Sequence, residues 1–130
     1  MTRSDFDLVV IGGGSGGVRA ARVAAELGAR VALVEGDEFG GTCVNLGCIP
    51  KKLLVHGAEF AHALSDARGF GWERVSPRFD WRELLARKDA EVARLNQVYE
   101  RALLAAGVLV LRGWARLLDA HHGQGGTRTV

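Results

Sequence analysis

The chain has 130 residues, of which 48% are hydrophobic and 25% are charged, and its formal net charge is +2. This length suits one domain with its own core, and no apolar run is long enough to span a membrane. Basic residues are dispersed and not interleaved with aromatic ones, so no nucleic-acid-binding surface is predicted. The N-terminus carries two acids before a short apolar run, which disfavours a secretory signal, and we expect a cytoplasmic location.

A βαβ unit is predicted at the start of the chain. Residues 6–11 form a short β-branched run that is typical of a strand buried on both faces. An alanine- and arginine-rich helix should follow over residues 18–27 and end at Gly28. A second strand is predicted over residues 30–35. The order strand, helix, strand indicates an α/β fold with a parallel sheet.

A glycine loop joins the first strand to the helix. Gly12, Gly14 and Gly17 satisfy the pattern G-x-G-x-x-G, and Glu35 ends the next strand about twenty residues later. Gly12 permits a tight turn, Gly14 lets a pyrophosphate approach the backbone, and Gly17 lets the helix pack close to the sheet. Glu35 is expected to accept hydrogen bonds from ribose hydroxyls. This context predicts a dinucleotide site; the alternative is a glycine-rich turn without a ligand.

The only two cysteines, Cys43 and Cys48, are separated by four residues within the glycine- and proline-flanked run of residues 40–52. A disulfide between them closes so short a ring that it stabilises the fold by roughly 2 kcal/mol at most. Beside a redox cofactor, the pair is better interpreted as a device that exchanges two electrons with a dithiol or disulfide. A structural disulfide and a metal site are the alternatives. The four histidines are not spaced to complete a metal site, and none is predicted.

Further elements are predicted from the remaining pattern. A helix over residues 51–68 should present Leu53, Leu54, Ala58, Ala61 and Leu64 on one apolar face. Asp80 and Glu83 predict the start of a long helix that runs to Ala106. Strands are expected over residues 108–111 and 114–118. The glycines of residues 123–126 are predicted to form a flexible hairpin loop.

The glycine loop, Glu35 and residues 40–52 resemble the N-terminal FAD segment of the pyridine nucleotide–disulfide oxidoreductases, and within them the glutathione reductases. The pattern G-G-T-C-V-N-x-G-C-[IV]-P-K-K is long and specific. Lysine directly after the proline, as Lys51 is here, is typical of glutathione and trypanothione reductases, whereas dihydrolipoamide dehydrogenases usually carry serine. The similarity continues to residues 112–115. It implies a Rossmann-like βαβ FAD-binding domain with a parallel sheet.

The resemblance also implies roles for individual residues. Cys43 would attack the substrate disulfide, Cys48 would lie against the flavin as a charge-transfer thiolate, and Lys51 would sit by the flavin's reactive edge. Cys48 precedes a helix expected to start near Pro50, and the N-terminal end of a helix favours a thiolate. FAD contacts are implied for Gly12, Gly14, Ser15, Gly16, Gly17, Glu35, Thr42, Cys43, Lys51 and, through its backbone, Ala115. Contacts with oxidised glutathione are implied for Ser15, Arg22 and Tyr99.

Arg19 departs from the family pattern, because small residues are common there in glutathione reductases and an acid is found in trypanothione reductases. A cation suits a substrate with free carboxylates and disfavours a polyamine. An exposed helix position without a role is the alternative for Arg19.

Members of this family are several times longer, with an NADPH-binding domain and an interface domain that forms a homodimer. We therefore expect residues 1–130 to be the N-terminal FAD-binding segment, incomplete as a domain and inactive alone. The sequence leaves three functions open. They are a glutathione-disulfide reductase segment, with dihydrolipoamide dehydrogenase or another flavoprotein disulfide reductase as its enzymatic alternative; a non-catalytic nucleotide-binding module; and a thiol-redox sensor.

Overall fold

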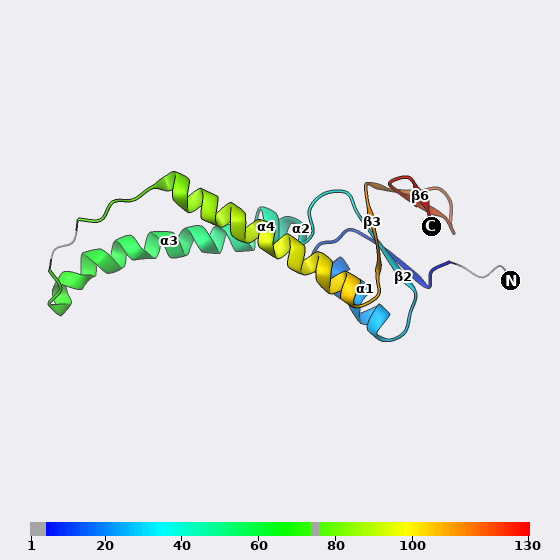
Figure 1. Ribbon diagram of the computed structural model, residues 1–130, viewed down its shortest axis with the longest axis horizontal. Helices are drawn as coiled ribbons and strands as arrows, with labels where there is room; N and C mark the ends of the chain where they lie inside the picture. The colour runs from blue at the N-terminus through cyan, green and yellow to red at the C-terminus, as the bar shows by residue number, and fades with distance from the viewer. Residues whose placement is uncertain (1–4, 74–75) are drawn as a thin grey trace.

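A computed structural model describes residues 5–73 and 76–130, which include a three-stranded parallel sheet of strand order β1-β2-β3 (Figure 1). Its strands are β1 (Leu8–Ile11), β2 (Val31–Glu35) and β3 (Leu109–Arg112). The register pairs Val10 with Leu33, and Leu33 with Val110. The strand, helix and parallel-strand order confirms the predicted Rossmann-like α/β fold.

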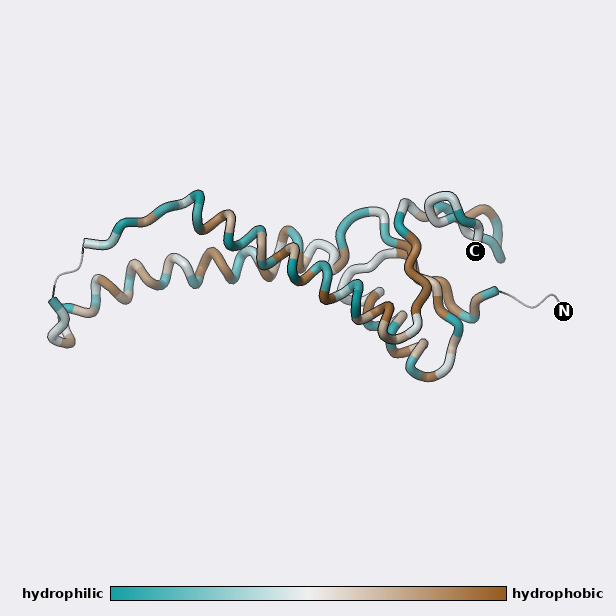
Figure 2. Tube along the Cα trace, in the orientation of Figure 1, coloured by the Kyte–Doolittle hydropathy of each residue, from teal (hydrophilic) through white to brown (hydrophobic). Residues whose placement is uncertain are grey.

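Two helices cover one face of this sheet and build the core. They are α1 (Ser15–Glu26), between β1 and β2, and α4 (Trp81–Ala105), before β3. Leu33 of β2 and Leu103 of α4 are fully buried in the cluster that joins both helices to the sheet. Burying one such side chain contributes about 1.5–3 kcal/mol, so this face of the sheet is held by hydrophobic packing. The three parallel strands form the main hydrophobic block in Figure 2.

A small antiparallel sheet covers part of the opposite face. It consists of β4 (Ala115–Leu117), β5 (Gly123–Gly125) and β6 (Arg128–Thr129). The prediction of a glycine hairpin loop was wrong, because residues 123–125 are a paired strand and the turn comes at Gly126, whose φ is +60°. A Cβ on Gly125 would lie 2.8 Å from Val34. The glycines therefore let β5 approach β2 closely.

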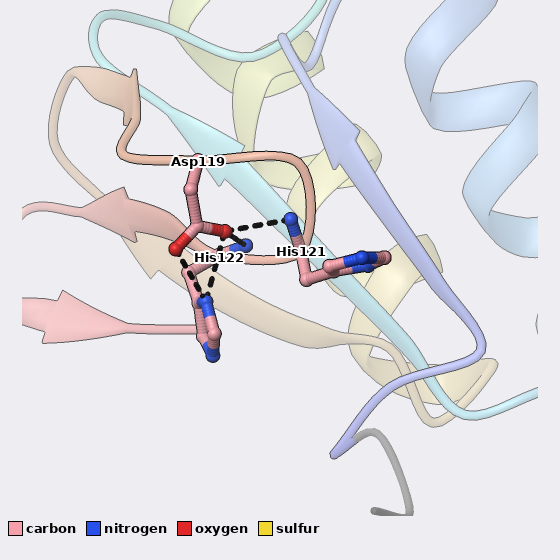
Figure 3. A network of polar contacts seen from close by, with 3 residues as sticks. All are labelled: Asp119, His121 and His122. Atoms are coloured by element: carbon pink, nitrogen blue, oxygen red, sulfur yellow. Dashed lines mark hydrogen bonds and ion pairs between the residues drawn. The ribbon is translucent and has the colours of Figure 1, made fainter. Parts of the chain in front are cut away.

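The connection between β4 and β5 is organised by Asp119 (Figure 3). Its Oδ1 accepts the backbone N–H groups of His121 at 2.7 Å and His122 at 2.8 Å, and the ring Nδ1 of His122 lies 2.8 Å from Oδ2. The bond from the His121 backbone, followed by the His122 ring, lowers the pKa of Asp119. The two adjacent histidines thus belong to a turn. Within residues 5–73 and 76–130, no group of three or more His, Cys, Asp or Glu could hold a metal.

A helical hairpin extends away from the sheets (Figure 1). After α2 (Gly41–Asn45), it runs through α3 (Cys48–Asp66) and η1 (Ala67–Phe70) and returns along α4. Asp80 caps α4 by accepting the N–H groups of Arg82 and Glu83, as predicted. The helices meet where a Cβ on Gly57 would lie 3.3 Å from Leu84.

The apolar face predicted for α3 is only partly covered. Leu53 and Leu54 are half-buried, whereas Ala58, Ala61 and Leu64 are exposed. α4 begins part-way along α3, so the second half of α3 has no helix beside it (Figure 1). No helix within the described part of the chain combines the length and apolarity needed to cross a membrane.

Candidate nucleotide and disulfide site

The glycine loop has the geometry that its pattern predicts. Gly12 has a φ of +99°, a left-handed conformation that favours glycine. A Cβ on Gly17 would lie only 1.9 Å from the carbonyl oxygen of Gly12, so helix α1 approaches the loop too closely for any side chain. The close-packing role predicted for Gly17 is therefore confirmed.

The start of α1 fits a phosphate group. Gly14 is the N-cap and supplies no side-chain hydrogen bond to the first turn. Ser15 and Gly16 are exposed, and a Cβ on Gly16 would meet nothing within 4 Å. The N–H groups of a helix start attract anions through hydrogen bonding and the helix dipole. The predicted pyrophosphate contacts thus lie on an open surface of the correct polarity.

Glu35 lies against the same loop from the end of β2. Its Oε2 accepts the N–H of Gly13 at 2.5 Å, and its Oε1 accepts the N–H of Asp37 at 2.7 Å. An ionised carboxylate has about four acceptor sites, so two backbone bonds leave capacity for ribose hydroxyls. The backbone N–H of Gly113 also donates to the Glu35 carbonyl at 2.8 Å. This bond brings Ala115, two residues later, toward the same corner of the sheet.

The segment before the cysteines is attached to the glycine loop. The N–H of Gly40 donates to the carbonyl of Gly13 at 2.8 Å, and Gly14 and Gly40 form a parallel bridge. A Cβ on Gly41 would lie 2.9 Å from the Cα of Gly14, so the two backbones touch. Thr42 and Cys43 follow directly on α2. The predicted nucleotide loop and the start of the helix that carries Cys43 are therefore held side by side.

The two thiols interact with each other. Cys43 on α2 is half-buried, Cys48 is the exposed first residue of α3, and both are free. The prediction that this helix starts near Pro50 is therefore two residues late; proline in the first turn lacks only an N–H that needs no partner. Hydrogen bonding to the Cys48 side chain, followed by desolvation, raises the pKa of Cys43; the backbone of Cys48 and then the charge of Lys51 oppose this more weakly.

The residues predicted to contact glutathione line one cavity of about 520 Å³ between α1 and α4. Arg22 forms an ion pair with Glu26 at 3.2 Å. Arg19, one turn earlier, makes no ion pair with any described residue. Cys43 and Cys48 do not line this cavity. Its described lining consists of Ser15, Val18, Arg19, Arg22, Val23, Glu26, Val98, Tyr99 and Ala102.

A larger cavity of about 750 Å³ lies between the two sheets. Ala115 is the only residue of the predicted site on its described lining, which otherwise includes Val9, Ile11 and the Asp119 turn. Because neither cysteine nor any residue of the glycine loop borders it, we place the chemistry at the loop and the thiols.

Sequence reasoning missed the contacts that hold the cysteine segment in place. Phe39 is fully buried, and the guanidinium of Arg112 lies 4.2 Å from the centre of its ring. Asn45 and Asn96 hydrogen-bond to each other at 2.8 Å. An asparagine between the cysteines and another beside the apolar positions of a long helix were the available signals.

The sequence matches the family model described as pyridine nucleotide-disulphide oxidoreductase over residues 6–130. Glutathione reductase of Burkholderia cepacia is 51% identical over 90% of this chain and 26% of its own length. The chloroplastic/mitochondrial glutathione reductase of Pisum sativum is 45% identical over 90% of this chain and 23% of its own length. Glutathione reductase of Nostoc sp. is also 45% identical, over 95% of this chain and 27% of its own length. The chain thus spans about a quarter of the length of these relatives. It belongs to the pyridine nucleotide-disulphide oxidoreductase family.

Proposed function

We propose that this chain is the FAD-binding and redox-dithiol segment of a glutathione-disulfide reductase. The observation that carries the proposal is the attachment of the Cys43 segment to the glycine loop, through Gly40 and Gly13 at 2.8 Å. This attachment holds the helix that carries Cys43 next to a loop that suits a phosphate-bearing cofactor. Similarity to relatives named glutathione reductase supports the choice of substrate.

FAD is the proposed cofactor of this segment. The open start of α1 and the carboxylate of Glu35 suit the pyrophosphate and ribose of the adenosine half. When bound, FAD supplies the two electrons that return the cysteine pair to the dithiol, and NADPH, bound in another domain of a longer homodimeric protein, is the proposed donor. The residues proposed to hold FAD are Gly12, Gly14, Ser15, Gly16, Gly17, Glu35, Thr42, Cys43, Lys51 and Ala115.

The two thiols perform the exchange with the substrate. The Cys43 thiolate attacks one sulfur of oxidised glutathione, which forms a mixed disulfide and releases the first glutathione as a thiolate that takes up a proton. The Cys48 thiolate then attacks the Cys43 sulfur, forms the Cys43–Cys48 disulfide and releases the second glutathione. The two electrons of the dithiol have then passed to the substrate. The charge of Lys51 favours the thiolate at Cys43.

The cavity between α1 and α4 is the proposed substrate contact. Glutathione carries free carboxylates, and a guanidinium binds a carboxylate through two parallel hydrogen bonds. Arg22 would exchange its ion pair with Glu26 for such a contact, whereas Arg19 has no ion pair to a described residue that it would have to exchange. Tyr99 and Ser15 add a ring and a hydroxyl to the same lining. Lipoamide lacks the carboxylates, so the two arginines favour glutathione over that substrate.

Serine variants test the division of labour in the full-length protein. Cys43→Ser is expected to abolish NADPH-dependent reduction of oxidised glutathione and to retain a long-wavelength thiolate-to-flavin absorbance. Cys48→Ser is expected to lose both. Retention of that absorbance in Cys48→Ser would mean that the two thiols have the opposite roles. If the unaltered protein turned over lipoamide faster than oxidised glutathione, lipoamide would be the substrate instead.

Glu35→Ala tests the cofactor assignment. Loss of the ribose hydrogen bonds should weaken FAD binding by about 1–3 kcal/mol, measured by quenching of flavin fluorescence. Glu38→Ala, at an exposed carboxylate three residues later, is the matched control and should leave the affinity unchanged. Unaltered FAD affinity in Glu35→Ala would remove Glu35 from the site.

A further inference from the structure

Two asparagine side chains connect the cysteine segment to the long helix α4. The amide nitrogen of Asn96 donates to the side-chain oxygen of Asn45 at 2.8 Å and to the carbonyl of Phe39 at 2.6 Å. The amide nitrogen of Asn45 donates in turn to the carbonyls of Gly41 at 3.0 Å and Phe39 at 3.2 Å. Each amide group has two N–H donors, and all four donors have acceptors.

Phe39, where both amides meet, is itself fixed. Its side chain is fully buried, and a Cβ on Gly13 would lie only 2.5 Å from its ring. The next residue, Gly40, donates to Gly13 in the glycine loop. The contacts therefore run from α4 through the two asparagines and Phe39 to the glycine loop.

Asn45 stands between the two cysteines, at the last residue of α2, and its side chain bonds back to the first residue of the same helix. This bond closes the single turn of helix that carries Cys43. The bond from Asn96 fixes that turn against α4, which also carries Tyr99 one turn later. A five-residue helix is too short to be stable by itself, so it depends on such tertiary bonds.

We propose that Asn45 and Asn96 are positioning residues that clamp the Cys43 segment between α4 and the glycine loop and thereby set how readily Cys43 and Cys48 close to a disulfide. The inference rests on the proposed function, because it takes this dithiol as the working redox pair. Neither residue is among those proposed to touch substrate or cofactor. They act by holding the first thiol where the second can reach it.

The test measures disulfide closure without flavin turnover. The protein is equilibrated with hydroxyethyl disulfide and 2-mercaptoethanol, alkylated, and the peptide carrying both cysteines is weighed. Closure removes two electrons and two protons from the dithiol and converts one hydroxyethyl disulfide to two molecules of 2-mercaptoethanol. These reagents carry no carboxylate, so the equilibrium does not depend on Arg19 and Arg22 in the cavity between α1 and α4. The ratio of disulfide to dithiol peptide, at known concentrations of the two reagents, gives the effective concentration of the thiol pair.

Asn96→Ala is expected to lower that effective concentration about tenfold, because it removes two hydrogen bonds. Asn45→Ala should lower it by a similar factor. The double variant should lower it little further, because both changes disrupt the same hydrogen-bond network. Gln97→Ala changes the exposed neighbour of Asn96 and should have no effect. Leu103→Ala empties a buried site on the same helix and controls for loss of stability alone.

An effective concentration within twofold of the unaltered protein in Asn96→Ala would overturn the clamp. An equal loss of effective concentration in Leu103→Ala would overturn it as well. So would a double variant whose loss equals the product of the two single losses. If Asn96→Ala does not fold, Asn96→Ser is measured against the same criteria. Absence of glutathione reduction by the unaltered protein would instead overturn the proposed function and leave this equilibrium measurable.

Discussion

Cys43 has neighbours with opposing effects on its thiol. The hydrogen bond with the Cys48 side chain and desolvation raise its pKa, and the Cys48 backbone and the positive charge of Lys51 lower it by less. The net effect keeps the proton on Cys43 to a higher pH than for a free cysteine. Because the thiolate is the nucleophile, the resting pair is less reactive at neutral pH than the adjacent lysine alone suggests.

Cys48→Ala should therefore lower the pKa of Cys43. The change removes the largest raising cause and leaves desolvation opposed by the backbone N–H of residue 48 and by Lys51. The pH midpoint for alkylation of Cys43 by iodoacetamide, followed by peptide mass under reducing conditions, should move to lower pH. Lys52→Ala, which changes a neighbouring charge that has no part in the shift, is the control. A midpoint unchanged by Cys48→Ala would contradict the interaction between the thiols.

Helix α1 requires glycine at position 17 and has room for a side chain at the preceding position, 16. A Cβ on Gly17 would lie 1.9 Å from the carbonyl oxygen of Gly12, whereas one on Gly16 would meet nothing within 4 Å. Because the Cβ would meet the backbone of Gly12, no flexible side chain can move aside to make room. The two glycines look alike in the sequence and differ only in what lies beside them.

Gly17→Ala should lower the free energy of unfolding by at least about 2 kcal/mol, because helix and loop must separate to admit a methyl group. Gly16→Ala is the matched control and should leave stability unchanged or raise it by up to about 1 kcal/mol. Urea denaturation of both variants measures the difference. Equal stability of the two would mean that the helix does not approach the loop as described.

The predictable elements were those fixed by local chemistry. The βαβ unit, the Asp80 cap and the left-handed Gly28, at a φ of +95°, follow from residue type and period. Strand β5 was missed because its glycines have no side-chain pattern, and only backbone pairing with β4 and β6 makes residues 123–125 a strand. The exposure of Leu64 and the Asn45–Asn96 contact likewise depend on segments far apart in sequence. Local propensity does not predict the exposure of Leu64, and the two asparagines, visible in the sequence, do not by themselves show that they meet.

The molecule as a whole is a compact sheet domain with a long helical hairpin attached (Figures 1 and 2). Several large apolar side chains on that hairpin are exposed, including Phe60 at 71% and Phe70 at 84%. On β1, Ile11 is 58% exposed, and both β1 and β3 are edge strands. Apolar surface and unpaired strand edges of this kind promote association.

We expect the 130-residue chain to self-associate at micromolar concentration, measured by light scattering. Phe60→Glu combined with Phe70→Glu should reduce the association, because both place a charge on the exposed hairpin surface. Leu27→Glu, at the C-cap of α1 where the side chain is 83% exposed, is the control and should leave the association unchanged. A monomer at these concentrations would show that the exposed surface does not drive association.

The pairing of β2 with β3 has a consequence for how the chain folds. Ala32 pairs with Leu109, so this contact closes a loop on the order of 75 residues. The helical hairpin lies inside that loop, and its contacts are more local, so we expect it to form first and bring β3 toward β2. Loop-closure entropy grows only slowly with length. Insertions at the far end of the hairpin, near Gly71, should therefore slow folding little and leave the sheet intact.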